Sequence, residues 1–148
     1  MADPDRTATA TAASLRLVVG RLARKLGRGG GLTLSQLSAL ASIEAAGVIR
    51  LADLAAIEGV SPPTLSRIVG SLTDAGHLTR RPDTADRRSS LVSLSPGGRR
   101  VLDATRRERT AALAERLRQL TPAEIARVRD ALPVLARLVD GFDPPRSG

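Results

Sequence analysis

The sequence has no cysteine, tryptophan or tyrosine, one phenylalanine and one histidine. Without cysteine, disulfides, zinc–thiolate sites and thiol-based redox sensing are excluded. A single histidine argues against a protein-built transition-metal site, so we expect no metal and no cofactor. Since aromatic residues are almost absent, the core must consist of Leu, Val, Ile and Ala, and this favours helices over a large β-sandwich.

Long apolar runs are also missing. No stretch approaches the roughly 20 apolar residues of a membrane-spanning helix. The N-terminus is acidic and polar, without the basic and apolar blocks of a signal peptide. We therefore expect no membrane partner and a cytoplasmic location.

Catalytic patterns are equally scarce. The only histidine, His77, has no neighbours that would orient it for a Ser-His-Asp or Cys-His set. The glycine run 29–31 falls between two predicted helices, not after a strand, so it is not a phosphate-binding loop. A pair of carboxylates is the one catalytic arrangement left open, and the sequence predicts that the protein is not an enzyme.

The charge is strongly one-sided. Lysine and arginine number 23 against 15 acidic residues, giving a net charge of +8. Such a basic excess is expected of a nucleic-acid-binding protein. A GC-rich coding bias towards arginine is the alternative explanation, but it does not explain where particular arginines fall.

Residues 51–76 have the pattern of a helix-turn-helix. The first helix spans about 51–58 and Gly59 opens the turn. Ser61 is a good N-cap, Pro62 suits the first helical position, and Gly76 is a natural stop. Apolar residues at helical spacing face the core: Leu65, Ile68, Val69 and Leu72. The outward face is small, polar and basic, as a major-groove helix requires: Pro63, Thr64, Ser66, Arg67, Gly70 and Ser71.

A β-hairpin is predicted to follow. Residues 78–81 and 91–94 have the alternation of short strands, and 48–50 is a candidate third strand. The connection 82–90 consists of turn-forming and charged residues, with Arg87 and Arg88 near its tip. Arginine suits a narrow minor groove, so the hairpin is interpreted as the wing of a winged helix.

The sequence from Ser61 to Gly98 resembles the winged helix-turn-helix of the multiple-antibiotic-resistance regulator (MarR) family. The most specific part is Asp86-Arg87-Arg88, followed by a strand and then Ser95-Pro96-Gly97. The resemblance implies a mainly α fold with a minor β part: a winged helix-turn-helix with N- and C-terminal dimerisation helices. It also implies a homodimer on a palindromic operator, most often a repressor, released by a small, often aromatic or phenolic anion. The family has no fixed ligand motif, and the lack of cysteine argues against its peroxide-sensing branch.

Candidate DNA contacts follow from the residue types. Arg67 is the best base-reading candidate, because arginine makes bidentate bonds to guanine. Hydroxyls that could bond phosphates or bases are Ser61, Thr64, Ser66 and Ser71; Ser61 is more often only a cap. Pro62 and Pro63 could contact thymine methyls. Arg87 and Arg88 are the wing candidates. For each arginine the alternative is an ordinary solvated side chain.

The resemblance assigns further roles. It places a groove-inserted arginine at Arg88 and a loop-steadying aspartate at Asp86, and it matches Arg80 to a recurrent arginine that could pair with Asp86. Arg50 stands where the family often has a Ser or Thr helix cap; it is expected either to reach a phosphate or to be solvated. His77 is expected to be the exposed start of a strand, with proton sensing as the less favoured alternative.

The remaining chain predicts amphipathic helices over about 14–26, 33–47, 95–120 and 121–140, with capping boxes at Thr33 and Thr121 and a kink at Pro133. The first ten residues and the tail from Asp143 are expected to be loose. We divide the chain into 1–30, an N-terminal arm and dimerisation helix; 31–95, the DNA-binding domain; and 96–148, C-terminal dimerisation helices. An intramolecular bundle is the alternative to a dimer.

Sequence analysis thus predicts a DNA-binding transcriptional regulator whose partners are double-stranded DNA and a second copy, with a small-molecule effector as a further candidate. The rival hypothesis is a winged-helix module that binds protein without sequence-specific DNA binding.

Overall fold

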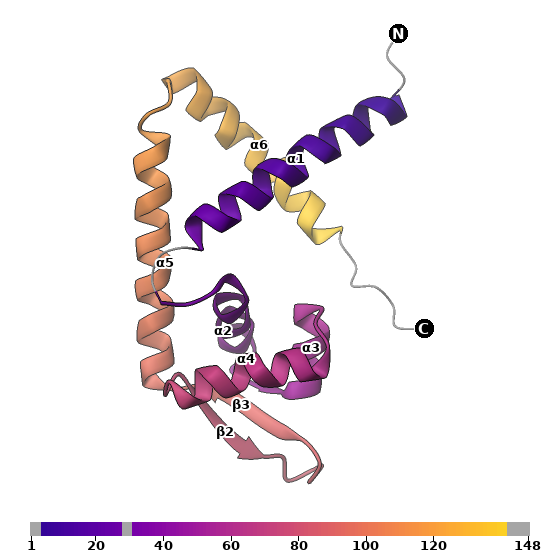
Figure 1. Ribbon diagram of the computed structural model, residues 1–148, viewed down its shortest axis with the longest axis vertical. Helices are drawn as coiled ribbons and strands as arrows, with labels where there is room; N and C mark the ends of the chain where they lie inside the picture. The colour runs from indigo at the N-terminus through magenta and orange to yellow at the C-terminus, as the bar shows by residue number, and fades with distance from the viewer. Residues whose placement is uncertain (1–3, 28–30, 142–148) are drawn as a thin grey trace.

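The computed structural model describes residues 4–27 and 31–141. Over these residues the chain forms six helices and three strands (Figure 1). They are α1 (Pro4–Leu26), α2 (Leu34–Ala46), β1 (Val48–Arg50), α3 (Leu51–Glu58), α4 (Pro62–Asp74), β2 (Leu78–Pro82), β3 (Ser90–Leu94), α5 (Pro96–Leu117) and α6 (Pro122–Asp140). The predicted mainly α fold with a winged helix-turn-helix is confirmed.

Most helix starts follow local capping signals. The Thr33 hydroxyl accepts the Gln36 backbone N–H, and the Gln36 side chain accepts the Thr33 N–H, which completes the predicted capping box. Thr121 and Glu124 form the second box at the start of α6. At α5 the Ser95 hydroxyl accepts the Gly98 N–H at 2.9 Å. These side chains satisfy donors that a helix start otherwise leaves unpaired.

The N-terminal helix is longer than predicted. The expectation of ten loose residues is wrong from residue 4 onwards, because α1 begins at Pro4. This segment is rich in alanine, the best helix former. The Thr9 and Thr11 hydroxyls donate to the carbonyls of Asp5 and Thr7, at 2.9 and 2.8 Å. The tail from Asp143 and the glycines at 29 and 30 lie outside the described residues.

The three strands form one antiparallel sheet in the order β1-β3-β2. Ile49 on β1 and Arg80 on β2 both pair with Val92 on the central strand. The predicted third strand is therefore present. β2 and β3 extend from the body of the molecule as the wing hairpin (Figure 1).

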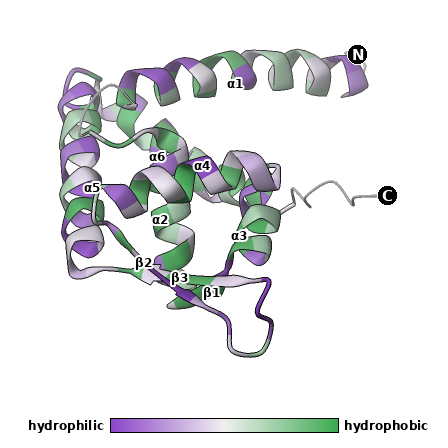
Figure 2. Cartoon of the chain, turned by 60° about the horizontal axis from the view of Figure 1, so that its bottom comes forward, coloured by the Kyte–Doolittle hydropathy of each residue, from purple (hydrophilic) through white to green (hydrophobic). Residues whose placement is uncertain are grey.

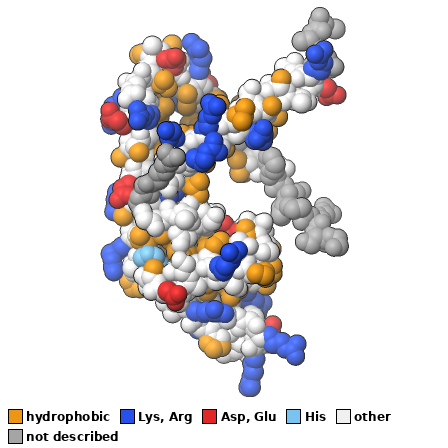
Figure 3. Space-filling view, in the orientation of Figure 1, with side chains coloured by type: hydrophobic (Ala, Val, Ile, Leu, Met, Phe, Trp, Pro, Cys, Tyr) orange, Lys and Arg blue, Asp and Glu red, His pale blue; other side chains and the backbone are white. Residues whose placement is uncertain are grey.

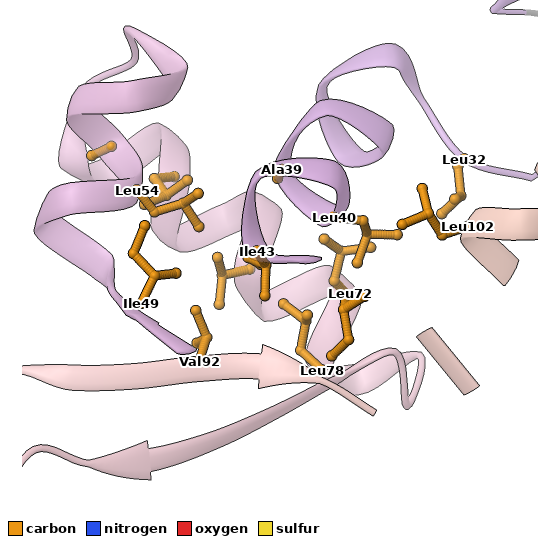
Figure 4. Close-up of a cluster of buried hydrophobic side chains, with 14 residues drawn as sticks. Leu32, Ala39, Leu40, Ile43, Ile49, Leu54, Leu72, Leu78, Val92 and Leu102 are labelled. Carbon is orange, nitrogen blue, oxygen red and sulfur yellow. The ribbon is translucent and has the colours of Figure 1, made fainter. Parts of the chain in front are cut away.

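The core is aliphatic, as the shortage of aromatic residues predicts. Figure 4 shows its side chains converging from the helices and the sheet. Fully buried members come from four helices and the central strand: Leu40 and Ile43 of α2, Leu54 of α3, Leu65, Val69 and Leu72 of α4, Val92 of β3 and Leu102 of α5. Since one side of α4 is buried in this core, its other side is fixed in orientation.

Helix α5 runs away from this core and carries two links to the rest of the body. Arg106 lies 2.7 Å from the Glu44 carboxylate on α2. Arg109 donates from Nη2 to the Leu32 carbonyl at 2.8 Å, just before α2 begins. The long helix is thus attached to the winged helix-turn-helix at more points than its N-terminus.

The outer helices leave much apolar surface uncovered. In α6 no described residue is buried. Large apolar side chains are exposed along both outer helices: Leu17, Val18, Val19 and Leu22 in α1, and Val128, Leu132, Val134, Leu138 and Val139 in α6. In Figure 3, hydrophobic surface is visible at this end of the molecule, away from the wing. No helix within the described ranges is long and apolar enough to cross a membrane.

Candidate nucleic-acid interface

The second helix of the helix-turn-helix, α4, presents a polar face to the outside. Ser66, Arg67 and Ser71 are exposed, as are Pro62 and Pro63 at its start. Thr64 and Gly70 are half-buried on the same side. The opposite face is locked into the core, so the helix has no freedom to turn this surface inwards.

At the start of α4, two of the candidate hydroxyls contact each other. The Ser61 and Thr64 hydroxyl oxygens lie 2.9 Å apart, and the Ser61 oxygen accepts the Thr64 N–H at 3.4 Å. Gly59 has the left-handed φ of +62° that ends α3 and turns the chain towards α4. Ser61 therefore acts as the predicted cap.

Ser71 has a partner on another helix. The Gln36 side chain donates to its hydroxyl at 3.2 Å and so connects the start of α2 to the exposed face of α4. A shallow hollow of about 410 Å³ lies along this side, lined by Thr33, Ser35, Gln36, Thr64, Arg67, Ile68 and Ser71. Its rim is mostly hydroxyl and amide groups, with one arginine.

The wing tip is shaped by two successive aspartate turns. The Asp83 carboxylate accepts the Ala85 N–H at 2.9 Å, and the Asp86 carboxylate accepts the Arg88 N–H at 3.0 Å. The second contact is what a loop-steadying role for Asp86 requires. Arg87 and Arg88 are exposed at the tip. Basic side chains gather there in Figure 3, and the same loop is the hydrophilic tip of the hairpin in Figure 2.

The expected pair between Arg80 and Asp86 is not formed. Nη2 of Arg80 donates to the Ser90 hydroxyl across the hairpin at 3.1 Å. Arg80 is opposite Val92, so Ser90 is its diagonal neighbour on the same face of the ladder. The side chain is held along the hairpin and remains exposed.

Arg50 makes a contact that neither expectation included. It is not simply solvated, because its Nε lies 2.5 Å from Oδ2 of Asp83. The Asp83 side chain is only 5% exposed, whereas that of Arg50 is 48% exposed. Arg50 occupies the N-cap position of α3 and makes no side-chain cap bond there.

The surroundings of Asp83 favour its charged form. The hydrogen bond from Arg50 is the largest cause that lowers the pKa of Asp83, followed by the Ala85 N–H. The same contact raises the pKa of Arg50. Sequence reasoning missed Asp83; its signal was the Pro-Asp-Thr-Ala turn pattern, which indicates a local backbone bond but not the distant arginine.

Between α4 and the wing lies a second hollow of about 340 Å³. It is lined by the start of α3, by α4, by β2 and by the wing: Leu51, Ala52, Pro62, Leu65, Ser66, Arg80, Asp86, Arg88, Ser89 and Ser90. The structure thereby brings together predicted residues from the helix and the hairpin, Ser66, Arg80 and Arg88. Arg67 and Ser71 line the hollow on the other side of α4.

His77 differs from the expected exposed strand start. It is half-buried, and its Nδ1 is buried with no hydrogen-bond partner in the described part of the chain. Its backbone carbonyl accepts the Ser95 N–H at 3.1 Å. Across residues 4–27 and 31–141, no three His, Cys, Asp or Glu residues gather in a way that would hold a metal ion.

Comparison with known proteins agrees with this architecture. Residues 32–90 match the MarR family. An HTH-type transcriptional regulator of Mycobacterium bovis is 39% identical over 132 residues, which cover 87% of this chain and 92% of that protein.

Solved structures share the fold. RV1404 from Mycobacterium tuberculosis is 28% identical with a TM-score of 0.72, covering 97% of this chain and 98% of that one. A mutant of MarR from E. coli, crystallised with operator DNA, is 24% identical with a TM-score of 0.67, covering 90% of this chain and 99% of that one. The chain therefore belongs to the MarR family of winged helix-turn-helix transcriptional regulators, and not to a family of enzymes.

Proposed function

We propose that two copies of this chain bind a palindromic operator in double-stranded DNA, repress transcription there, and are released by a small molecule, for which a phenolic or aromatic anion is the leading class. The observation that carries DNA binding is the arrangement of α4 and the wing around one arginine-lined hollow. A helix in the major groove and a wing in the next minor groove leave one sugar–phosphate strand to pass between them. Arg80, Arg88 and Ser66 line that passage.

In this proposal Arg67 reads bases, and Pro62, Pro63, Ser66 and Ser71 approach the major-groove floor or its phosphates. Arg87 and Arg88 enter the minor groove, and Asp86 shapes their loop. The hydroxyls of Ser61 and Thr64 chiefly hold the helix start, because each already contacts the other. A mutant of MarR from E. coli with the same fold has been crystallised with operator DNA, and this supports DNA binding by the present chain.

The proposed dimer involves residues 1–30 and 96–148, with 31–95 as the DNA-binding unit. Its support is the exposed apolar surface of α1 and α6, which a monomer would leave in water. A two-fold dimer places its two α4 helices in successive major grooves, about 34 Å apart. An operator with inverted half-sites follows from that symmetry.

Selection from a random duplex library tests the function directly. We expect enrichment of an inverted repeat with half-site centres about one helical turn apart, roughly 10–10.5 base pairs. A reporter with the selected sequence inside its promoter should lose expression when the protein is present, and a panel of aromatic acids should include one that restores it. Enrichment of no sequence would contradict the operator, and increased expression would contradict repression.

The dimer has its own test. Leu138→Asp on α6 should shift the protein towards monomer in sedimentation velocity, because a charge would replace a 49% exposed leucine of the proposed interface. Ile57→Asp is the matched control, since Ile57 is 61% exposed on α3, outside the proposed interface. Equal effects of the two substitutions would contradict the assignment.

The rival function, a module that binds protein and not DNA, is separated by a salt titration with random duplex DNA. Non-specific binding that weakens steeply with salt is expected of the proposed function. Absence of binding even at low salt would favour the rival.

A further inference from the structure

The wing extends beyond the core, and its loop has a single buried side chain. Of residues 83–89, only Asp83 is buried, while the tip residues are exposed. The Asp83 carboxylate accepts hydrogen bonds from Arg50, from the Ala85 N–H and, at 3.4 Å, from the Ser89 hydroxyl. A buried carboxylate with three donors is a fixed point in an otherwise solvated loop.

The partner of Asp83 comes from the opposite edge of the sheet. Arg50 ends β1 and pairs with Leu91 on the central strand, whereas Asp83 directly follows Pro82 at the end of β2. The ion pair therefore passes over β3 and joins the two outer strands. Because α3 begins immediately after Arg50, the contact also ties the wing loop to the start of the helix-turn-helix.

The local backbone does not need this arginine. Arg50 stands at the N-cap of α3, a position where Ser, Thr, Asp or Asn would satisfy an orphan N–H, and it makes no such bond. Its guanidinium is committed to Asp83 instead. The contact is thus long-range, between residues 33 apart in the chain, and not a by-product of capping.

We infer that Asp83 and Arg50 are positioning residues for DNA binding: their ion pair fixes the wing loop against the start of α3 and so sets the distance between the wing arginines and α4. Arg88 and Ser89, which follow in the same loop, line the hollow opposite Ser66 of α4. Without this ion pair, the width of the passage between the wing and α4, through which the sugar–phosphate strand is proposed to run, would no longer be fixed. The inference rests on the proposed DNA-binding function.

Asp83→Asn separates a pure charge effect from a positioning effect on DNA affinity. If only charge mattered, removing a negative charge beside the DNA would strengthen phosphate binding. If Asp83 positions the wing, the same substitution should weaken DNA binding. We expect the variant to bind the selected duplex about tenfold more weakly, as for the loss of one charge-assisted contact, with a shallower dependence of affinity on salt. Glu108→Gln, which removes one exposed negative charge from α5, far along the chain from the wing, is the control; it should sediment and bind like the wild type.

A double-mutant cycle identifies the route of the effect. Arg88→Ala should weaken binding strongly in the wild type and only slightly in Asp83→Asn, because the released arginine no longer contributes. Full additivity of the two losses, or binding by Asp83→Asn that is equal to or tighter than that of the wild type, would overturn the inference.

Arg50→Ser keeps the test valid if Asp83→Asn fails to fold. Serine can cap α3, which offsets part of the stability that is lost when the buried Asp83 carboxylate loses its guanidinium partner. Thermal unfolding should show that the variant is folded, and we expect the folded variant to bind DNA more weakly than the wild type. Hydrogen exchange should show faster exchange at Ala85 and Ser89 in the free protein. Weaker binding with unchanged exchange would show direct phosphate contact by Arg50 and overturn positioning. If the wild type itself binds no duplex, the proposed function fails, which is a different result from all of these.

Discussion

Gly98 packs directly against the backbone carbonyl of His77. A Cβ atom added at Gly98 would lie 2.0 Å from that oxygen, far inside contact distance. The same carbonyl accepts the Ser95 N–H, so the first turn of α5 lies against the start of β2 with no space between them. This contact places α5 relative to the wing, and it explains why His77 is half-buried.

Gly98→Ala should therefore destabilise the protein, although alanine is the better helix former. Overpacking against a backbone atom costs about 1–3 kcal/mol, and no flexible side chain is available to move aside. Urea unfolding followed by circular dichroism measures the loss. A variant as stable as the wild type would show that α5 can shift away from the sheet.

Gly70→Ala is the contrasting case within α4. A Cβ at Gly70 would meet no atom within 4 Å, so helix propensity alone predicts a gain of about 0.5–1 kcal/mol. Because Gly70 lies on the face proposed to enter the major groove, the added methyl should at the same time weaken binding to the selected duplex. Unfolding and duplex titrations on one preparation test both effects. Unaltered affinity would mean that this part of α4 stays clear of the DNA.

Arg67→Ala should relax sequence preference. If Arg67 makes a bidentate contact with guanine, its removal loses about 1–3 kcal/mol of discrimination at one position of each half-site. Repeating the library selection with the variant would reveal that position as newly degenerate. Uniform weakening with an unchanged consensus would instead assign Arg67 to a phosphate.

Arg88→Ala should lower DNA affinity without changing sequence preference. In the proposed function Arg88 is attracted by the negative potential of a narrow minor groove and does not read particular bases. We expect weaker binding to all duplexes, with the slope of log affinity against log salt reduced by about one unit. Titrations at several salt concentrations, with selected and random duplexes, provide the measurement. A change of consensus without a change of slope would contradict the assignment.

The Asp83 anchor predicts a dependence of stability on pH. Its pKa is lowered in the folded protein, chiefly by the hydrogen bond from Arg50. The stabilisation is therefore complete above the pKa of an ordinary aspartate, about 3.9, and disappears as the pH falls through the lower folded value. The difference in unfolding free energy between wild type and Asp83→Asn should be constant from neutral pH to about 4 and should shrink in more acidic solution. A difference that persists unchanged into strong acid would show that the anchor does not depend on charge.

Local signals account for what the sequence predicted well. The starts of α2, α4, α5 and α6 are encoded within four residues, by a Ser or Thr cap followed by a proline or a Glu or Gln partner. The apolar spacing of α4 fixes which face is buried, and the wing follows from turn residues between two short strands. The start of α1 was misplaced because a Thr- and Ala-rich stretch has no apolar period, although it is a capable helix former.

Contacts between distant residues account for what was missed. Nothing near Arg50 indicates Asp83, because the two meet only after β3 has been inserted between β1 and β2. Arg80 was expected to pair with Asp86 across the hairpin, but the ladder register places Ser90 beside it. The burial of His77 likewise depends on the arrival of α5.

The attachment of α5 to the body at both Glu44 and Leu32 has a mechanical consequence. A helix of 22 residues is about 33 Å long, so a tilt of about 5° at one end displaces the other by about 3 Å. Arg106 of α5 holds Glu44 of α2, and Arg109 of α5 holds the carbonyl of Leu32, just before α2 begins. Because of these two contacts, α5 and the winged helix-turn-helix move as one body. In the proposed dimer, small rearrangements among the outer helices would therefore be magnified at the two α4 helices, and the spacing of these helices would no longer match one turn of the DNA.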